Sequence, residues 1–328
     1  MSSRRFQRYQ GVTLLASEVA VLKELESQYG EPVYHIEFQN RGIEDFSFIE
    51  EGRHIIELNI FYKRLENLPE SVFSLKKLKY LNLLENGLCS LSESIGNLRR
   101  LVGLDMRWNN LETLPESFGQ LSKLQNLNLS WNQLRSLPVS FGNLSDLQVL
   151  TLQNNQLSSL TNSFGELTQL IDLDLRWNNL KSLPANFGNL SNLQRLYLHK
   201  NQLQTLPESF GQLQNLRSLQ LTHNQLESLP KSLKNFSNLE FFSFTGNPLG
   251  GKIALFELAQ TNPVFHRYVS SHIRYLFDHS LIPLLDPNSF EIRNIFCPHC
   301  GIAPLMTGKE KQTGQERVFC LNCENIIH

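Results

Sequence analysis

The chain has 328 residues, of which 41% are hydrophobic and 19% charged, and its formal net charge is −1. This composition favours a folded protein with a large core, and it excludes a global field that attracts nucleic acid or acidic lipid. No stretch approaches the ~18 to 20 uninterrupted apolar residues of a membrane helix, so we expect no membrane partner.

The first residues read poorly as a secretory signal. The first five residues, which end at Arg5, are basic, as in a signal peptide. However, Glu18 interrupts the short apolar stretch that begins at Val12, and no small-residue cleavage site follows. Four of the five cysteines form two C-x-x-C pairs near the end, whereas a secreted repeat protein more often carries disulfides at its ends. We therefore expect a cytoplasmic protein, in which the fifth cysteine, Cys89, is a small buried apolar residue.

The N-terminal segment is expected to cap the repeats that follow it. Apolar residues recur at helical spacing over residues ~13–29, and Gly30 and Pro32 predict the end of this helix. Its apolar face could instead dock a partner. A weak copy of the repeat follows, so residues 1–52 are assigned to a capping helix and a degenerate first repeat. The helical positions are Leu15, Val19, Leu22, Leu25 and Tyr29, and the weak copy is Val33, Ile36, Phe38 and Ile43.

A 23-residue repeat dominates the chain over residues 53–250. Each copy contains the pattern L-x-x-L-x-L-x-x-N-x-L, and the asparagines recur at a strict period. An earlier copy keeps the phase but has Lys63 in place of the asparagine, which makes nine copies. The asparagines are Asn86, Asn109, Asn132, Asn155, Asn178, Asn201, Asn224 and Asn247, and the earlier copy is Ile55, Leu58, Ile60 and Leu65.

The pattern predicts a coil with one short strand. Leu127 and Leu129 alternate with polar residues, as in a half-buried strand that ends before Asn132. Stacked asparagines should bond the backbone of tight turns, and the second half of each copy should form an irregular or short helical return. Because a single coil cannot bury its leucines alone, the coils must stack. We therefore expect an α/β solenoid, curved like a horseshoe, with a parallel sheet on its concave side.

The return segment carries the sequence L-P-x-x-F-G. In this pattern the repeats resemble the intracellular leucine-rich-repeat class of Ras-group scaffold proteins, over roughly residues 50–250. The resemblance implies a protein partner, with a small GTPase or another signalling protein as candidates. The chain departs from the pattern at Ser92 and Thr161, where Pro is expected, and at Phe73 and Lys234, where Gly is expected. The matching segments begin at Leu114, Leu137, Leu183 and Leu206.

The C-terminal end of the solenoid should also be capped. Gly250 and Gly251 end the repeat phase, and Asn262 followed by Pro263 predicts a helix start. Apolar residues continue at helical spacing, so residues 251–294 are expected to form a helical cap over ~252–280 and a linker.

The tail, residues 295–328, contains two C-x-x-C pairs separated by 19 residues. Four thiolates at this spacing strongly indicate one structural Zn²⁺ in a zinc ribbon, with the segment between the pairs folding back as a hairpin. Cys-Pro-His-Cys also resembles a thiol–disulfide active site, but too little chain follows for that fold. The expected zinc ligands are Cys297, Cys300, Cys320 and Cys323.

Partner contacts are expected on the concave surface, at positions that the core does not require. All three tryptophans fall in one column, directly before the repeat asparagine, and the ~4.8 Å spacing of strands predicts that Trp108 and Trp131 are neighbours. In two copies an Asp and an Arg at i and i+2 could pair. Packing of the tryptophans on one another, or recent duplication, would explain the same pattern without function. The predicted contact residues are Tyr62, Asp105, Arg107, Trp108, Trp131, Asp172, Asp174, Arg176, Trp177, Tyr197, His199 and His223.

These features favour a protein-interaction scaffold that is not an enzyme. Trp, Tyr and Arg are the residue types that dominate interface energetics. A nucleic-acid-associated adaptor that uses the ribbon is an alternative, but the ribbon has three positive and three negative side chains and no basic stripe. The substrate-recognition part of a ubiquitin-ligase-like enzyme is less favoured, since a RING needs eight metal ligands. No G-x-x-x-x-G-K-[ST] loop is present.

Overall fold

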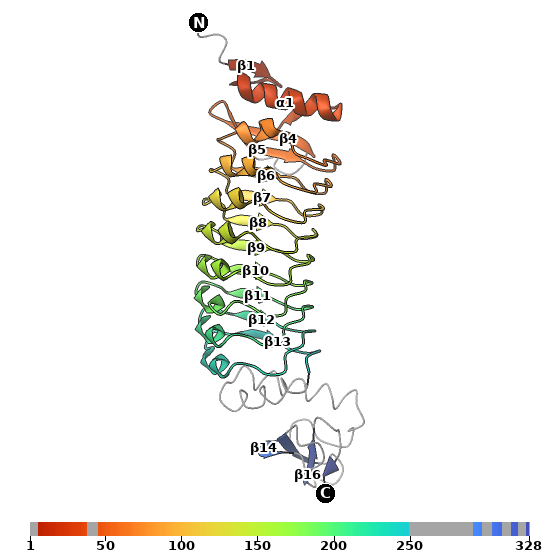
Figure 1. Cartoon of the computed structure of the whole chain (residues 1–328), viewed down its shortest axis with the longest axis vertical. Helices are drawn as coiled ribbons and strands as arrows, with labels where there is room; N and C mark the ends of the chain where they lie inside the picture. The colour runs from red at the N-terminus through yellow and green to blue at the C-terminus, as the bar shows by residue number, and fades with distance from the viewer. Residues whose placement is uncertain are drawn as a thin grey trace.

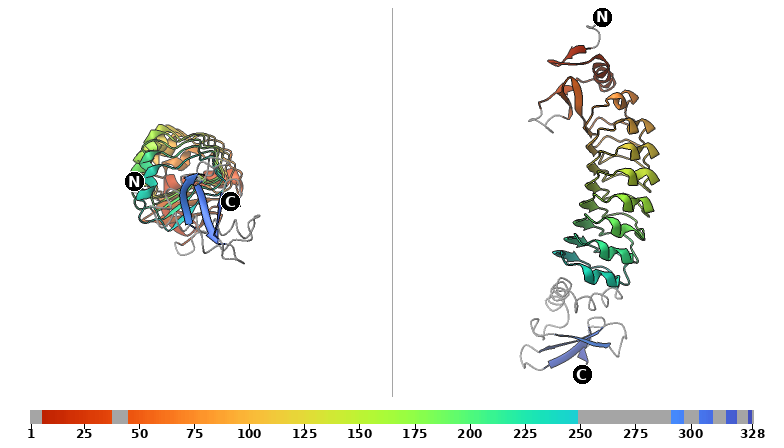
Figure 2. Two further views of the ribbon diagram at one scale, coloured as in Figure 1. Left: turned by 90° about the horizontal axis from the view of Figure 1, so that it is seen from below. Right: turned by 90° about the vertical axis from the view of Figure 1, so that its left-hand side faces the viewer.

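The computed structural model describes residues 6–37 and 45–248, together with four C-terminal strands at 291–296, 304–309, 316–320 and 326–327. In the first two ranges, one continuous apolar core runs from the N-terminal segment through the last repeat. In Figures 1 and 2 the repeats stack along one axis, with strands on one side and short helices on the other. None of the described helices has the length and apolar character to cross a bilayer.

A hairpin and a helix form the N-terminal end. Strands β1 (Phe6–Tyr9) and β2 (Val12–Leu15) pair antiparallel, and helix α1 (Ala16–Tyr29) follows. The predicted helix is therefore confirmed, but it begins at Ala16 because the preceding residues belong to β2. It ends at Gly30 with φ 72°, the left-handed conformation of a helix C-terminus. Val19, Leu22 and Leu25 of α1 are buried in the common core.

An antiparallel strand separates the repeats from the weak copy proposed at Val33 and Ile36. Strand β3 (Tyr34–His35) pairs parallel with β4 (Phe46–Glu51), and β4 pairs antiparallel with β5 (His54–Ile60). Residues 33–37 therefore do not form a coil stacked on the first repeat, which corrects that prediction. The reason is a tight turn at Gly52 and Arg53, both at positive φ, which reverses the chain into a hairpin. Phe38 and Ile43 lie outside the described residues.

Nine parallel strands, one per repeat, form the rest of an 11-stranded sheet. Residues that are one repeat apart lie side by side on neighbouring strands, as Leu104 of β7 and Leu127 of β8 do. The middle residue of each strand is buried. After β5 the strands are β6 (Tyr80–Asn82), β7 (Gly103–Asp105), β8 (Asn126–Asn128), β9 (Val149–Thr151), β10 (Asp172–Asp174), β11 (Arg195–Tyr197), β12 (Ser218–Gln220) and β13 (Phe241–Ser243).

The predicted asparagine ladder is present. The Nδ2 atom of Asn155 donates to the carbonyl oxygens of Leu129, 2.9 Å away, and Leu152, 3.0 Å away. Its Oδ1 accepts from the backbone N–H of Leu134 at 3.0 Å. The same three bonds recur in the other coils from Asn132 to Asn247, apart from small differences in distance. Each asparagine thus satisfies buried backbone groups of two coils.

The return segments form short 3₁₀ helices. Phenylalanines from successive coils stack beneath them, with ring centroids 5.8 to 6.4 Å apart from Phe118 to Phe210. Where Ser92 replaces proline, its side chain caps the helix by accepting from the N–H of Ser94. The helices are η2 (Glu70–Ser74), η3 (Glu93–Asn97), η4 (Glu116–Gln120), η5 (Val139–Asn143), η6 (Asn162–Glu166), η7 (Phe187–Asn189), η8 (Glu208–Gln212) and η9 (Lys231–Asn235).

Four strands of the tail form a separate antiparallel sheet in sequence order. They are β14 (Glu291–Phe296), β15 (Pro304–Lys309), β16 (Glu316–Cys320) and β17 (Ile326–Ile327). The hairpin predicted between the two cysteine pairs corresponds to β15 and β16. The helical cap predicted over ~252–280, together with Cys297, Cys300 and Cys323, lies outside the described residues.

Candidate functional site on the concave face

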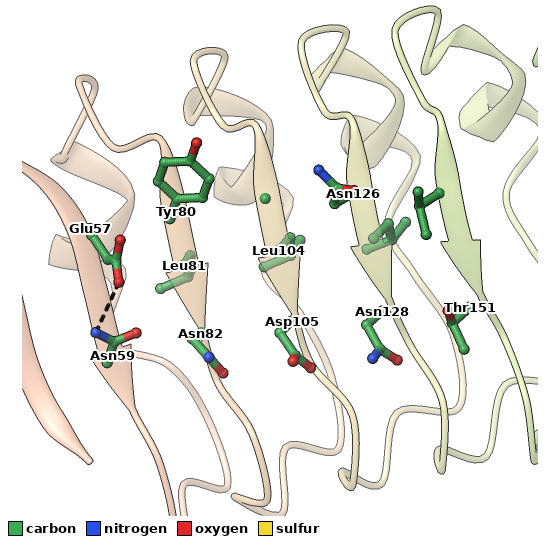
Figure 3. A pocket seen from close by; sticks show the side chains of 13 residues that line it. Glu57, Asn59, Tyr80, Leu81, Asn82, Leu104, Asp105, Asn126, Asn128 and Thr151 are labelled. Carbon is green, nitrogen blue, oxygen red and sulfur yellow. Dashed lines mark hydrogen bonds between the residues drawn. The ribbon is translucent and has the colours of Figure 1, made fainter. Parts of the chain in front are cut away.

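The concave face has a hollow of about 340 Å³ over strands β5 to β9 (Figure 3). Its polar lining comes mainly from the first and third residues of each strand, because the middle residue points toward the core, and the middle residues Leu81, Leu104 and Leu127 also line it. Its lining residues are Glu57, Asn59, Tyr80, Leu81, Asn82, Gly103, Leu104, Asp105, Asn126, Leu127, Asn128, Val149 and Thr151.

A glycine shapes the middle of the hollow. Gly103 takes the first position of β7, where the neighbouring strands carry Tyr80 and Asn126. A Cβ added at Gly103 would lie 2.8 Å from Cδ1 of Tyr80. The tyrosine ring therefore leans across the space that the missing side chain leaves.

Polar residues at the third strand position cap the turn that follows the strand. The Oδ1 atom accepts from the backbone N–H two residues later, at 3.3 Å for Asn82, 3.1 Å for Asp105 and 3.1 Å for Asn128. Asp174 makes the same bond in β10. These Asx turns hold the side chains in one orientation along the row.

The two predicted Asp–Arg pairs are both formed. Nε of Arg107 lies 3.0 Å from Oδ2 of Asp105, and Nε of Arg176 lies 2.8 Å from Oδ2 of Asp174. Arg176 also donates to Oε1 of Gln153 at 3.0 Å. Desolvation raises the pKa of both aspartates, and the bonds from their arginines oppose that rise only in part.

We expect Asp105→Asn to be as stable as the wild type at neutral pH, or more stable. A carboxyl whose folded pKa is raised contributes stability below its unfolded pKa, and loses that contribution as pH rises through the folded pKa. Asparagine keeps the oxygen that caps Arg107 and carries no charge to desolvate. Thermal unfolding of both proteins at neutral and acidic pH checks this. As pH falls, the melting temperature of the wild type should rise relative to that of the variant. A variant that is clearly less stable at neutral pH would contradict the expectation.

The tryptophans lie beyond the strands, in the turn before the ladder asparagine. This column has left-handed backbone, with φ between 56° and 58° at Trp108, Trp131, Asn154 and Trp177. The prediction placed these residues on the strand, so their position is corrected here. The predicted contact is confirmed, since the rings of Trp108 and Trp131 stack at 4.2 Å with planes 6° apart. Lys200 lies over the ring of Trp177, with its Nζ 5.2 Å from the centroid.

These tryptophans remain accessible despite the stacking. Trp108 is 47% exposed, Trp131 39% and Trp177 50%. Tyr62 occupies the same column near the N-terminal end and is 53% exposed. We call the column of Tyr62, Trp108, Trp131, Trp177 and His223 the aromatic rim.

A second group of predicted residues lies on β10 and β11. Both guanidinium nitrogens of Arg195 on one side, Nε and Nη2, donate to the carboxylate of Asp172. The guanidinium carbon of Arg176 lies 5.8 Å from the ring centroid of Tyr197. Burial lowers the pKa of His199, and the charges of Arg176, His223 and Lys200 lower it further.

The predicted residues thus fall into two groups. Asp105 lines the hollow, and Arg107, Trp108 and Trp131 lie in the turns that follow β7 and β8. The residues from Asp172 to His199 form the group on and after β10 and β11. Tyr62 and His223 lie toward opposite ends of the rim. Cys89 is exposed, which corrects the expectation that it is buried. Apart from Asp105, the residues that line the hollow were not predicted, although the positions flanking the inner leucines identify them. Among the described residues, no cluster of His, Cys, Asp and Glu could hold a metal ion.

Comparison with known proteins agrees with this architecture. A family model described as "Leucine-rich repeat region" matches residues 55–179 and 155–247, which together exceed half of the chain. No curated protein matches the chain. A leucine-rich-repeat protein of Leptospira interrogans is similar in structure, with 35% identity, a TM-score of 0.55 and coverage of 59% of this chain and 50% of that one.

Two further solved structures are similar. The leucine-rich-repeat ectodomain of the plant membrane receptor kinase GASSHO1/SCHENGEN3 from Arabidopsis thaliana, in complex with Casparian strip integrity factor 2, has 29% identity and a TM-score of 0.53, with coverage of 62% of this chain and 27% of that one. The effector YopM from Yersinia pestis has 30% identity and a TM-score of 0.50, with coverage of 58% and 49%. The chain therefore spans half of the first relative and about a quarter of the second. With its family model, its strand register and its asparagine ladder in agreement, the chain belongs to the leucine-rich repeat family.

Proposed function

We propose that this protein is a scaffold that binds a partner protein through the aromatic rim and the adjacent concave hollow. Leucine-rich-repeat proteins generally mediate protein–protein interaction. The observation that carries the proposal is the pair of stacked, accessible indoles of Trp108 and Trp131, which lie in the turns that follow β7 and β8, two of the strands that line the hollow. Large aromatic side chains bury much area at low entropic cost, and they dominate the binding energy of interfaces.

The backbone conformation does not require a tryptophan at either position. Asn154 occupies the same column between Trp131 and Trp177 with the same left-handed φ. A polar residue is therefore compatible with the turn. The tryptophans expose apolar surface to solvent, and the fold does not need that surface. Recognition of a partner accounts for them better than packing does. The resemblance to Ras-group scaffolds makes a small GTPase one candidate partner. We propose that the protein acts in the cytoplasm and that it has no enzymatic activity.

Replacing Trp131 with asparagine tests the proposal. Because Asn154 shows that asparagine fits this backbone, we expect a nearly unchanged melting temperature. We also expect a loss of partner affinity of roughly 30-fold or more, as for an interface hot spot. Affinity capture from native cytosol, quantified by mass spectrometry for wild type and variant, measures the loss. Val139→Ala, at an exposed site on the return side, serves as the control. Unchanged capture by the Trp131 variant would reject the rim as the contact surface.

We also propose that the tail holds one structural Zn²⁺ through Cys297, Cys300, Cys320 and Cys323. The strand topology supports this proposal. Phe296, which directly precedes the first pair, lies beside Pro304 at the start of β15, and Cys320 lies beside the adjacent Leu305. The strands that lead into the two pairs therefore end at the same edge of the sheet. Four thiolates gathered there would suit tetrahedral zinc.

Elemental analysis of the purified protein is expected to find one zinc per chain. Because metal binding supplies the folding energy of so small a module, a chelator should release the zinc and unfold the tail while the repeats stay folded. Circular dichroism and thiol titration follow the two events separately. Metal-free protein with four reactive thiols in a folded tail would contradict the assignment.

A further inference from the structure

We propose that the hollow over β5 to β9 binds a proline-rich segment of a partner protein in the polyproline II conformation. The proposal rests on the protein-binding function above and specifies the chemistry of the bound segment. It follows from the hydrogen-bonding groups that the hollow presents, from its aromatic wall and from the spacing of its coils.

Amide donors face the hollow without a partner. The Oδ1 atoms of Asn82 and Asn128 each accept from a backbone N–H, which can only donate, so the two amide orientations are fixed. The Nδ2 groups must then point away from the turns, and neither donates to any group in the described part of the chain. Both side chains line the hollow (Figure 3).

The acceptors in the row of Asn82, Asp105 and Asn128 are engaged. Both carboxylate oxygens of Asp105 accept from Arg107, one from its backbone N–H and one from Nε. Glu57 is only 5% exposed, and its Oε1 accepts from Nδ2 of Asn59 at 3.3 Å. Asn126 offers one further amide, with both a donor and an acceptor. The row of Asn82, Asp105 and Asn128 therefore presents free amide donors while its oxygens are already bonded, and it complements a ligand that is rich in acceptors and poor in donors.

A proline-rich segment has this character. A polyproline II helix makes no internal hydrogen bonds, so its carbonyl oxygens are free to accept, and proline has no N–H that would need an acceptor. A sugar would bring hydroxyl donors that find no free acceptor along this row. An anionic ligand is disfavoured too, since Glu57 and Asp105 line the hollow and no Lys, Arg or His does.

The wall of the hollow suits proline rings. Proline-rich segments dock in grooves lined by aromatic side chains. The ring of Tyr80 leans over Gly103 at the first strand position, two residues along the strand from the row of Asn82, Asp105 and Asn128, and Val149 adds apolar surface on β9. A prolyl ring at Gly103 would contact the tyrosine ring while its carbonyl faces the row of asparagines.

The spacing of the donors matches the ligand's repeat. Asn82 and Asn128 occupy the same strand position on either side of Asp105, two strands apart. At ~4.8 Å per strand they are separated by ~9.6 Å. One turn of polyproline II, three residues, advances ~9.3 Å, so carbonyls one turn apart would meet both amides. Alternate residues of a β-strand repeat every ~6.6 Å and would miss the second amide.

Calorimetric titration of the full chain with blocked decaproline tests the proposal. We expect saturable binding, at least tenfold weaker in the double variant Asn82→Asp/Asn128→Asp. Aspartate keeps the oxygen that caps each turn and replaces the donor with an acceptor. The matched control is Asn143→Asp/Asn189→Asp, which adds the same charge at exposed positions on the return side. An uncharged second variant, Gly103→Ala, should also weaken binding, because its Cβ displaces the ring of Tyr80.

Several results would overturn the assignment. They are no saturable binding of decaproline, equal binding of a glycine–serine peptide of the same length, and stronger binding of maltohexaose or oligo-dT. Equal losses in the control and hollow variants would also overturn it, provided that circular dichroism shows all of them folded. If decaproline does not bind while capture of the partner protein still depends on Trp131, the proposed ligand class is wrong and the scaffold function stands. If decaproline binds while capture ignores Trp131, the rim assignment fails instead.

Discussion

Phe164→Ala is expected to lower the free energy of unfolding by about 3 to 5 kcal/mol. The Phe164 side chain is 1% exposed and lies between Phe141 and Phe187, with ring centroids 6.4 and 6.2 Å away. Removing the ring loses its burial and leaves a cavity that the two neighbouring rings line. Because each coil of a solenoid is stabilised through its neighbours, the cavity weakens two coil interfaces at once.

Urea unfolding followed by circular dichroism measures this loss as a lower midpoint. Val139→Ala is the matched control, since Val139 lies on the same return side and is 66% exposed. Its midpoint should stay close to that of the wild type. A loss below about 1 kcal/mol for the Phe164 variant would show that the stack collapses around the cavity without cost.

Asn155→Ala is expected to cost about 3 to 5 kcal/mol, from unsatisfied polar groups rather than from a cavity. The substitution removes the donors that reach the carbonyl oxygens of Leu129 and Leu152, and the acceptor for the N–H of Leu134. An unsatisfied buried group costs about 1 to 3 kcal/mol, and three such groups arise together. The damage is shared by adjacent coils, since Leu129 belongs to one coil and Leu152 to the next.

The neighbouring substitution Gln156→Ala is the control, because Gln156 is exposed and bonds only through its backbone N–H among the described residues. Urea unfolding gives the overall loss, and amide hydrogen exchange at Leu134 reports the lost acceptor directly. Unchanged protection of that amide would show that water or a shifted backbone replaces the asparagine, against the expectation.

Much of the fold could be predicted because a repeat multiplies one local signal. The alternation around Leu127 and the period of Asn132 place a short strand and a turn in every copy. Copies of equal length then stack in register, as the pairing of Leu104 with Leu127 shows. The N-terminal end has no such repetition, and the hairpin of β4 and β5 was missed although Gly52 and Arg53 mark its turn.

The left-handed backbone of the rim also had a signal in the sequence. The column that holds the tryptophans contains Asn154 and Gly246, two residue types that tolerate positive φ. Read together, they indicate a turn rather than a strand at this position. The pairing of Asp105 with Arg107 was predicted from the shared face of strand residues i and i+2, but β7 ends at Asp105 and the pair forms within the Asx turn that follows.

The sequence alone determined the coil, its inward and outward faces and the column in which the tryptophans gather, because each depends on residues close together in one repeat. The tertiary structure decided where the concave face is hollow and what the hollow presents. Tyr80 fills space beside Gly103 only because strands β6 and β7 are adjacent, and the amides of Asn82 and Asn128 form one row only across three coils. Contacts between residues 23 or 46 positions apart depend on how coils stack, and a pattern within one repeat does not contain them.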